Sequence, residues 1–209
     1  MAEPEMDDFE ESSDEENVEQ NVGAGGGAVF ARNPASANAT AILDYTTKKD
    51  IIYYNTATDS LYNNPDDHFD ATAEGLQTFL RLLKERARRY NWATQNGDGV
   101  LNIPEEVVQN DGQWVEEGAY HNLLTSYGTI EMKLLRAYVK LYITNTVRPT
   151  QDDDMILKCC QESLTTSAYN KVMMHEKEFT IRGIPSGVLF LKVLLRESHI
   201  DCNASSTAI

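Results

Sequence analysis

The sequence is poor in cysteine and histidine, two residue types common in catalytic centres. It has only three cysteines, two of them adjacent at Cys159 and Cys160, and four scattered histidines. Three cysteines do not make a disulfide framework, so we expect a reducing, cytoplasmic compartment. Cys160 and His175 are a possible pair of nucleophile and base. Both are expected on apolar helix faces, where buried thiols are usually inert. The sequence also contains no HExxH motif and no G-x-S-x-G elbow. We therefore predict no enzyme, no catalytic residue, no cofactor and no small-molecule substrate.

The sequence also lacks long apolar runs, and its first 21 residues lack Lys and Arg. The longest apolar run, GVLFL before Lys192 and VLL after it, is far shorter than the roughly 20 residues that span a bilayer. Residues 1–21 hold ten Asp and Glu and no Lys or Arg, and a Gly/Ala-rich stretch without a phosphate-loop context follows. Such a segment cannot bury enough apolar surface to offset the entropy of ordering. We predict a disordered acidic arm over 1–40, no signal peptide and no membrane partner.

The rest of the chain, 41–209, shows helical periodicity and no βαβ alternation. Apolar residues recur at helical spacing in six or seven segments with short links. The first expected helix starts at the cap Thr47 and ends by Pro65, although a strand is also possible there. The others are 72–92, 113–127, 130–145 with Thr129 as its cap, one that starts at Pro149 and Thr150, one begun by Thr165 or Thr166, and 188–200. The segment after Ser186, which is expected to be exposed, is apolar on almost every side and is predicted to lie at the centre of the core. Asp201 is a candidate cap for one more helix. The fold class that follows is all-α, with one helical domain after the acidic arm.

One stretch, TQNGDGVLNIPE at 94–105, resembles a calcium-binding EF-hand loop. With Gly99 at the turn position, Asn96, Asp98 and Glu105 fall at ligand positions three, five and twelve. Thr94 occupies the first position, where an aspartate belongs, and the sequence shows no second loop. Asn-Gly-Asp-Gly is also a common turn composition. We therefore predict a turn without a metal site and keep an EF-hand-like calcium-binding regulatory protein as an alternative.

Two charged clusters are candidates for an interaction surface. The first lies on the helix expected at 72–92 and is the only basic patch that the sequence shows. It consists of Arg81, Lys84, Arg86, Arg88 and Arg89. A nucleic-acid site would need more basic residues or interleaved aromatics. The second cluster is Asp152, Asp153 and Asp154 at a helix start, where the helix dipole favours carboxylates. We predict that the basic face is solvated or meets the acidic cluster of another copy.

The order of sequence blocks resembles a known family. The blocks are HFDATAEGLQTFLRLLKERARRYNW, LNIP, NLLTSYGTIEMKLLRAYVKLYI, QDDDMILKCCQESLTTSAYNKV and FTIRGIPSGVLFLKVLLRESHIDCNASSTAI. Together they resemble the Gag, or capsid-like, region of copia-type LTR retrotransposons over roughly 41–209. The last block is the most specific, and the others are mainly helix-and-turn patterns.

The resemblance implies a helical, non-enzymatic structural domain that associates with itself around element RNA. Family members usually carry a C-x2-C-x4-H-x4-C zinc knuckle that binds RNA, and this sequence has none. We expect the chain to represent the N-terminal part of such a region, to self-associate, and to bind RNA weakly or only through a missing downstream segment. A monomeric cytosolic adapter domain is the remaining alternative.

Overall fold

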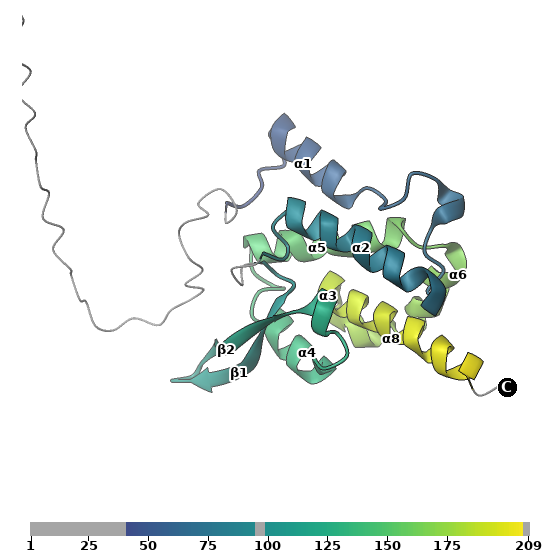
Figure 1. Ribbon diagram of the computed structural model, residues 1–209. Helices are drawn as coiled ribbons and strands as arrows, with labels where there is room; N and C mark the ends of the chain where they lie inside the picture. The colour runs from purple at the N-terminus through teal and green to yellow at the C-terminus, as the bar shows by residue number, and fades with distance from the viewer. Residues whose placement is uncertain (1–40, 95–98, 207–209) are drawn as a thin grey trace, which may run out of the picture.

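A computed structural model describes residues 41–94 and 99–206, with side chains described up to His199. The expected disordered arm over 1–40 lies outside the described residues. Eight α-helices, one short 3-10 helix and two antiparallel hairpins form the described part (Figure 1). The helices are α1 Lys48–Thr58, η2 Pro65–Asp67, α2 Ala73–Arg89, α3 Leu123–Ser126, α4 Met132–Lys140, α5 Arg148–Glu162, α6 Thr166–Met173, α7 Glu176–Phe179 and α8 Gly187–Ser206.

The all-α prediction is wrong, because two hairpins make the fold mixed α and β, although helices dominate. The larger hairpin pairs β1 Asn102–Asn110 with β2 Gln113–Asn122, and the smaller pairs β3 Thr180–Ile181 with β4 Ile184–Pro185. The larger hairpin replaces most of the helix that was expected over 113–127. Only its last residues are helical, in α3.

The turn of the larger hairpin explains why this stretch is not a helix. Asp111 and Gly112 are the two turn residues, and both have positive φ angles, of 47° and 82°. Two positive φ angles in a two-residue turn match the right-handed twist of the flanking strands, and Asp-Gly is a favoured pair for this geometry. The turn therefore fixes the register in which Val108 faces Val115 and Gln109 faces Trp114.

Several helix starts were predicted correctly. Thr47 caps α1 by accepting a hydrogen bond from the backbone amide of Asp50, at 3.2 Å. Thr165 caps α6 in the same way through Ala168, also at 3.2 Å. Other starts differ. The N-cap of α4 is Glu131 rather than Thr129.

Two predictions about the end of the chain are wrong. Ser186 is fully buried rather than exposed. Residue Asp201 caps no new helix, since α8 continues through it to Ser206.

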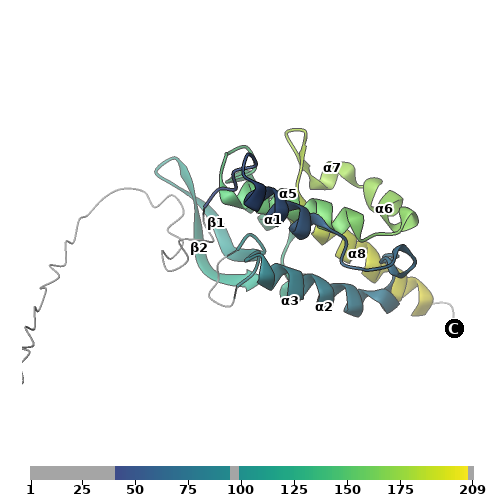
Figure 2. The same ribbon diagram turned by 90° about the horizontal axis from the view of Figure 1, so that it is seen from above.

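Helix α8 lies at the centre of the helical body, as its apolar sequence predicted. It contacts α2, α4, α5, α6 and α7, and α5 also packs against α1 (Figures 1 and 2). The side chains of 188–191 and 193–195 are completely buried. Close approach of α8 to α5 depends on Gly187, where a Cβ atom would lie 2.3 Å from the carbonyl oxygen of Asp153.

Candidate functional site

The calcium-like stretch does not gather its candidate ligands in the described part of the chain. Asn96 and Asp98 lie outside the described residues. Glu105 lies on β1, where its carboxylate accepts a hydrogen bond from the amide of Ala119 and bonds His121 Nε2, each at 3.2 Å. The Ala119 bond, followed by the His121 bond, lowers the pKa of Glu105. Within the described residues, no group of three or more His, Cys, Asp or Glu side chains is arranged to hold a metal ion.

The basic residues of α2 differ in the contacts that they make within the chain. Arg86 donates hydrogen bonds to the backbone oxygens of 56, 57, 59 and 60, with donor–acceptor distances of 2.8–3.1 Å. These carbonyls end α1 and begin the following loop, where helix geometry provides no partners. Arg81 pairs with Glu85 at 3.1 Å. Arg81 is exposed as well, so the exposed part of the predicted face consists of Arg81, Lys84, Arg88 and Arg89.

The acidic cluster is mostly buried in contacts within the chain. Asp152 is 5 % exposed and accepts a hydrogen bond from Arg148 Nε at 2.8 Å. Asp154 is partly exposed and accepts a hydrogen bond from Tyr54 at 2.7 Å, which ties α5 to α1. The structure does not bring this cluster and the α2 face together. Only Asp154 of the three reaches the surface, so the predicted pairing between copies would have one carboxylate available.

Asp153 is a titratable group in the interior of the helical body. It is completely buried, and its Oδ1 accepts hydrogen bonds from Val188 N at 2.9 Å and Ser186 Oγ at 3.1 Å. Burial raises the pKa of Asp153 to about 7, although these hydrogen bonds act in the opposite direction. The carboxylate holds the first turn of α8 and has no route to solvent, so its role is structural.

The proposed nucleophile pair gains no support from the geometry. Cys159 and Cys160 are both fully buried, and burial raises the pKa of the Cys159 thiol to about 12 and that of Cys160 well above its ordinary value. His175 instead lies between Glu178 and Glu197, at 3.0 and 3.4 Å. Thiols with raised pKa values remain protonated and unreactive near neutral pH.

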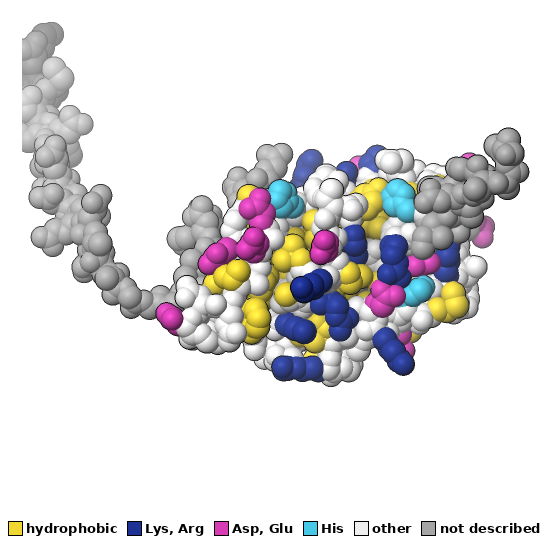
Figure 3. Space-filling model, turned by 90° about the horizontal axis from the view of Figure 1, so that it is seen from below, with side chains coloured by type: hydrophobic (Ala, Val, Ile, Leu, Met, Phe, Trp, Pro, Cys, Tyr) yellow, Lys and Arg dark blue, Asp and Glu magenta, His cyan; other side chains and the backbone are white. Residues whose placement is uncertain are grey.

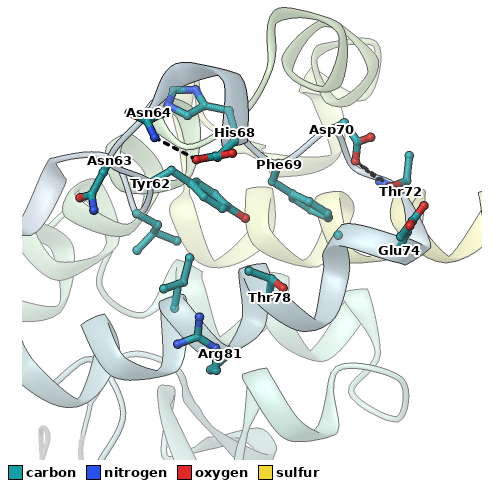
Figure 4. Close-up of a pocket in the computed structure, with 14 residues that line it drawn as sticks. Tyr62, Asn63, Asn64, His68, Phe69, Asp70, Thr72, Glu74, Thr78 and Arg81 are labelled. Carbon is teal, nitrogen blue, oxygen red and sulfur yellow. Dashed lines mark hydrogen bonds between the residues drawn. The ribbon is translucent and has the colours of Figure 1, made fainter.

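An open hollow of about 610 Å³ lies between the η2 segment and the first half of α2 (Figure 4). Its wall includes Tyr62, Asp67, Asp70, Glu74 and Arg81. Burial, and then the nearby Asp70 carboxylate, raise the pKa of Tyr62 to about 12. Asp70 already accepts bonds from the amide and hydroxyl of Thr72 at 3.1 and 2.7 Å. The hollow is therefore lined by both polar and apolar groups, and Asp70 is already occupied by Thr72.

The larger hairpin projects from the helical body, and the sequence patterns did not predict it. Its base packs against α3 and α4, and its tip projects away from the helical body in two views (Figures 1 and 2). Trp114 and Tyr120 on β2 are 59 % and 43 % exposed. The signal that could have found it is Asp111-Gly112 between strand-like runs.

A second basic surface, also missed, covers α4 and the α7–β3 region. Lys133, Arg136 and Lys140 lie on one side of α4, because residues three, four and seven apart share a helix face. Arg136 donates to the backbone oxygens of 177, 178 and 180, which joins this face to the exposed Lys177 and Arg182. We call Lys133, Arg136, Lys140, Lys177 and Arg182 the α4 basic surface. Figure 3 shows Lys and Arg side chains gathered over the body on the side seen from below.

Comparison with known protein families, curated proteins and solved structures finds no match. None of the helices in the described part of the chain is both long and apolar enough to cross a membrane.

Proposed function

We propose that this chain is a Gag-like structural protein that works by associating with copies of itself rather than by catalysis, in the cytoplasm. The proposal starts from the resemblance of its sequence blocks to copia-type Gag regions. Three of those blocks supply α2, α5 and α8, and the most specific one supplies the helix at the centre of the core. The resemblance therefore follows residues that build the domain rather than loops.

The observation that carries the proposal is the kind of group exposed at the surface. The most prominent feature is a projecting hairpin with exposed Trp114 and Tyr120, and tryptophan and tyrosine are enriched at the energetic centres of protein interfaces. The Cys160 thiol, by contrast, is completely buried. This combination favours a binding surface for protein.

RNA is the less favoured partner of this chain. Its net charge is −15, and binding a polyphosphate requires several Lys or Arg residues that neutralise phosphates together. The two basic surfaces are each small and lie on a chain that carries an excess of acid. We propose that RNA contact is weak and that protein–protein contact dominates.

Size-exclusion chromatography of the full chain with in-line light scattering tests the proposal. A self-associating protein elutes earlier and shows a larger mass as its loading concentration rises. A monomeric adapter keeps a mass of 23.5 kDa at every concentration. A constant monomer mass together with salt-sensitive micromolar RNA binding would replace self-association with an RNA-binding function.

A further inference from the structure

The larger hairpin lacks a partner for most of its surface in the described chain. Strands β1 and β2 pair only with each other, so both outer edges are unpaired among the described residues. A two-stranded hairpin alone is marginally stable in water and usually gains support from packing. Here α3 and α4 support only the base, while the tip residues are exposed.

The two exposed aromatic residues of β2 lie on opposite faces of the hairpin. Trp114 and Glu116 share one face, because side chains two residues apart in a strand share a face. A β-bulge shifts the register before Tyr120, which pairs with Pro104 while Glu117 pairs with Glu106. The Tyr120 hydroxyl donates a hydrogen bond to Glu116 Oε2 at 2.7 Å, which orients the ring. The register therefore places Tyr120 on the same face as the carboxylates of Glu106 and Glu117.

The hairpin is also uniformly acidic. Residues 102–122 contain five carboxylates and no Lys or Arg. Glu106 and Glu117 are direct cross-strand partners and both are exposed. Like charges directly opposite each other destabilise a strand pair, and neither residue has an ion pair in the described chain. A cationic surface brought against the hairpin would relieve this repulsion.

The α4 basic surface has the complementary charge. Lys133, Lys140, Lys177 and Arg182 are exposed, and Arg136 holds the two parts of the surface together through its backbone contacts. In Figure 3 carboxylates gather toward the hairpin side, while Lys and Arg side chains gather over the helical body. The projecting tip of a hairpin points away from its own body (Figures 1 and 2), so it faces neighbouring molecules.

We propose that the larger hairpin of one copy docks on the α4 basic surface of a second copy. This inference rests on the proposed self-association and identifies the surfaces that perform it. Pairing between two hairpins is disfavoured, because both are acidic. Docking on the α4 basic surface instead pairs Glu106 and Glu117 with Lys133 and Lys140.

Tyr120 supplies the directional part of the contact. It shares the face of Glu106 and Glu117, so it is placed to lie against a lysine or arginine side chain, where the face of its ring attracts the cation. Charge complementarity then sets the association rate and the choice of partner, and the aromatic contact sets how long the complex lasts.

Charge-swapped variants of the full chain test this pairing. The hairpin variant is Glu106→Lys with Glu117→Lys, and the surface variant is Lys133→Glu with Lys140→Glu. Each variant alone places like charges in contact, so we expect its self-association constant to weaken by about tenfold or more. An equal mixture of the two restores both contacts, and we expect association to return to within about threefold of the wild type.

Two matched controls separate this interface from general effects. Lys84→Glu with Arg88→Glu makes the same change of charge on the exposed face of α2 and leaves the α4 basic surface intact. Ile52→Ala removes an apolar side chain that is 53 % exposed, for comparison with Tyr120→Ala. We expect both controls to associate like the wild type and Tyr120→Ala to associate more weakly. Circular dichroism confirms that each variant is folded.

Sedimentation velocity with one labelled partner gives the readout. If the wild type associates but the swapped variants associate equally well, or their mixture shows no recovery, the hairpin interface is wrong while self-association stands. Loss of association in the α2 control alone would move the interface to α2. If the wild type stays monomeric while Lys133→Glu with Lys140→Glu abolishes salt-sensitive RNA binding, the surface binds RNA and both proposals fail.

Discussion

The Oδ1 atom of Asp153 on α5 accepts a hydrogen bond from the backbone amide of Val188, 2.9 Å away in the first turn of α8. The Ser186 hydroxyl donates to the same oxygen. A buried carboxyl group thus accepts a hydrogen bond from an N-terminal backbone amide of the central helix, which has no partner within the helix. Negative charge is favoured at this end of a helix. This contact joins the two helices that form the middle of the body, and it makes stability depend on pH.

We predict that Asp153 lowers stability as pH rises toward neutrality. Its pKa is about 7 in the folded chain, against an ordinary value of 3.8, so the native state binds the proton more tightly. Between about pH 4 and 7 the folded state therefore holds more protons, and the free energy of unfolding falls as pH increases.

Urea unfolding across that range, for wild type and Asp153→Asn, measures this effect. The wild type should lose more stability than the variant, by at most about 1.4 kcal/mol per pH unit, because Asn cannot titrate. Parallel pH profiles for the two proteins would show that Asp153 stays charged throughout.

Gly187→Ala should destabilise the protein by roughly 3 kcal/mol, because a new methyl group would meet the α5 backbone rather than a movable side chain. A Cβ atom there would lie 2.3 Å from Asp153 O and 2.4 Å from Leu157 N. Gly128→Ala is the matched control, since no atom lies within 4 Å of its Cβ position. Thermal unfolding should separate the two variants clearly. An equal effect at both positions would mean that α5 and α8 can move apart at little cost.

Arg86→Ala should cost about 2 kcal/mol, because it leaves several backbone oxygens at the end of α1 without their donor. Arg88→Ala, on the same helix but exposed and without these contacts, should change stability by less than about 0.5 kcal/mol. Chemical denaturation of both variants provides the measurement. If Arg88→Ala were the more damaging change, the role assigned to Arg86 would be wrong.

Calcium should not bind the full chain with useful affinity. The Glu105 carboxylate already bonds Ala119 and His121 on the neighbouring strand, and Thr94 replaces the first carboxylate of a calcium loop. Isothermal titration in low salt should show only the heat of dilution. A dissociation constant below about 10 μM, at the weak edge of the sensor range, would contradict this expectation.

Local signals in the sequence were enough for most helices. Thr47 and Thr165 mark helix starts through side-chain caps, and the apolar run 188–195 identifies the central helix without further information. The hairpin was missed because Val115 and nearby residues also fit a helical period. The deciding signal was Asp111-Gly112, whose two positive φ angles close a two-residue turn.

The candidate site was harder to predict than the fold, because long-range partners decide which charges are free. Arg86 and Arg88 look equivalent on the α2 face, yet Arg86 caps another helix 26 to 30 residues away in the sequence. Asp152 and Asp153 were expected at a helix start, but α5 begins at Arg148 and both residues lie within it, buried against Arg148 and α8. Helical periodicity alone does not reveal which neighbour covers a face.

The central claim, that this chain associates with itself through complementary charged surfaces, is tested most directly by sedimentation equilibrium of the full-length protein. We predict that its weight-average mass rises above 23.5 kDa with concentration in low salt, and that added salt reverses the rise, because screening weakens exposed charge pairs. A mass that stays at 23.5 kDa at every concentration and salt level would contradict the account.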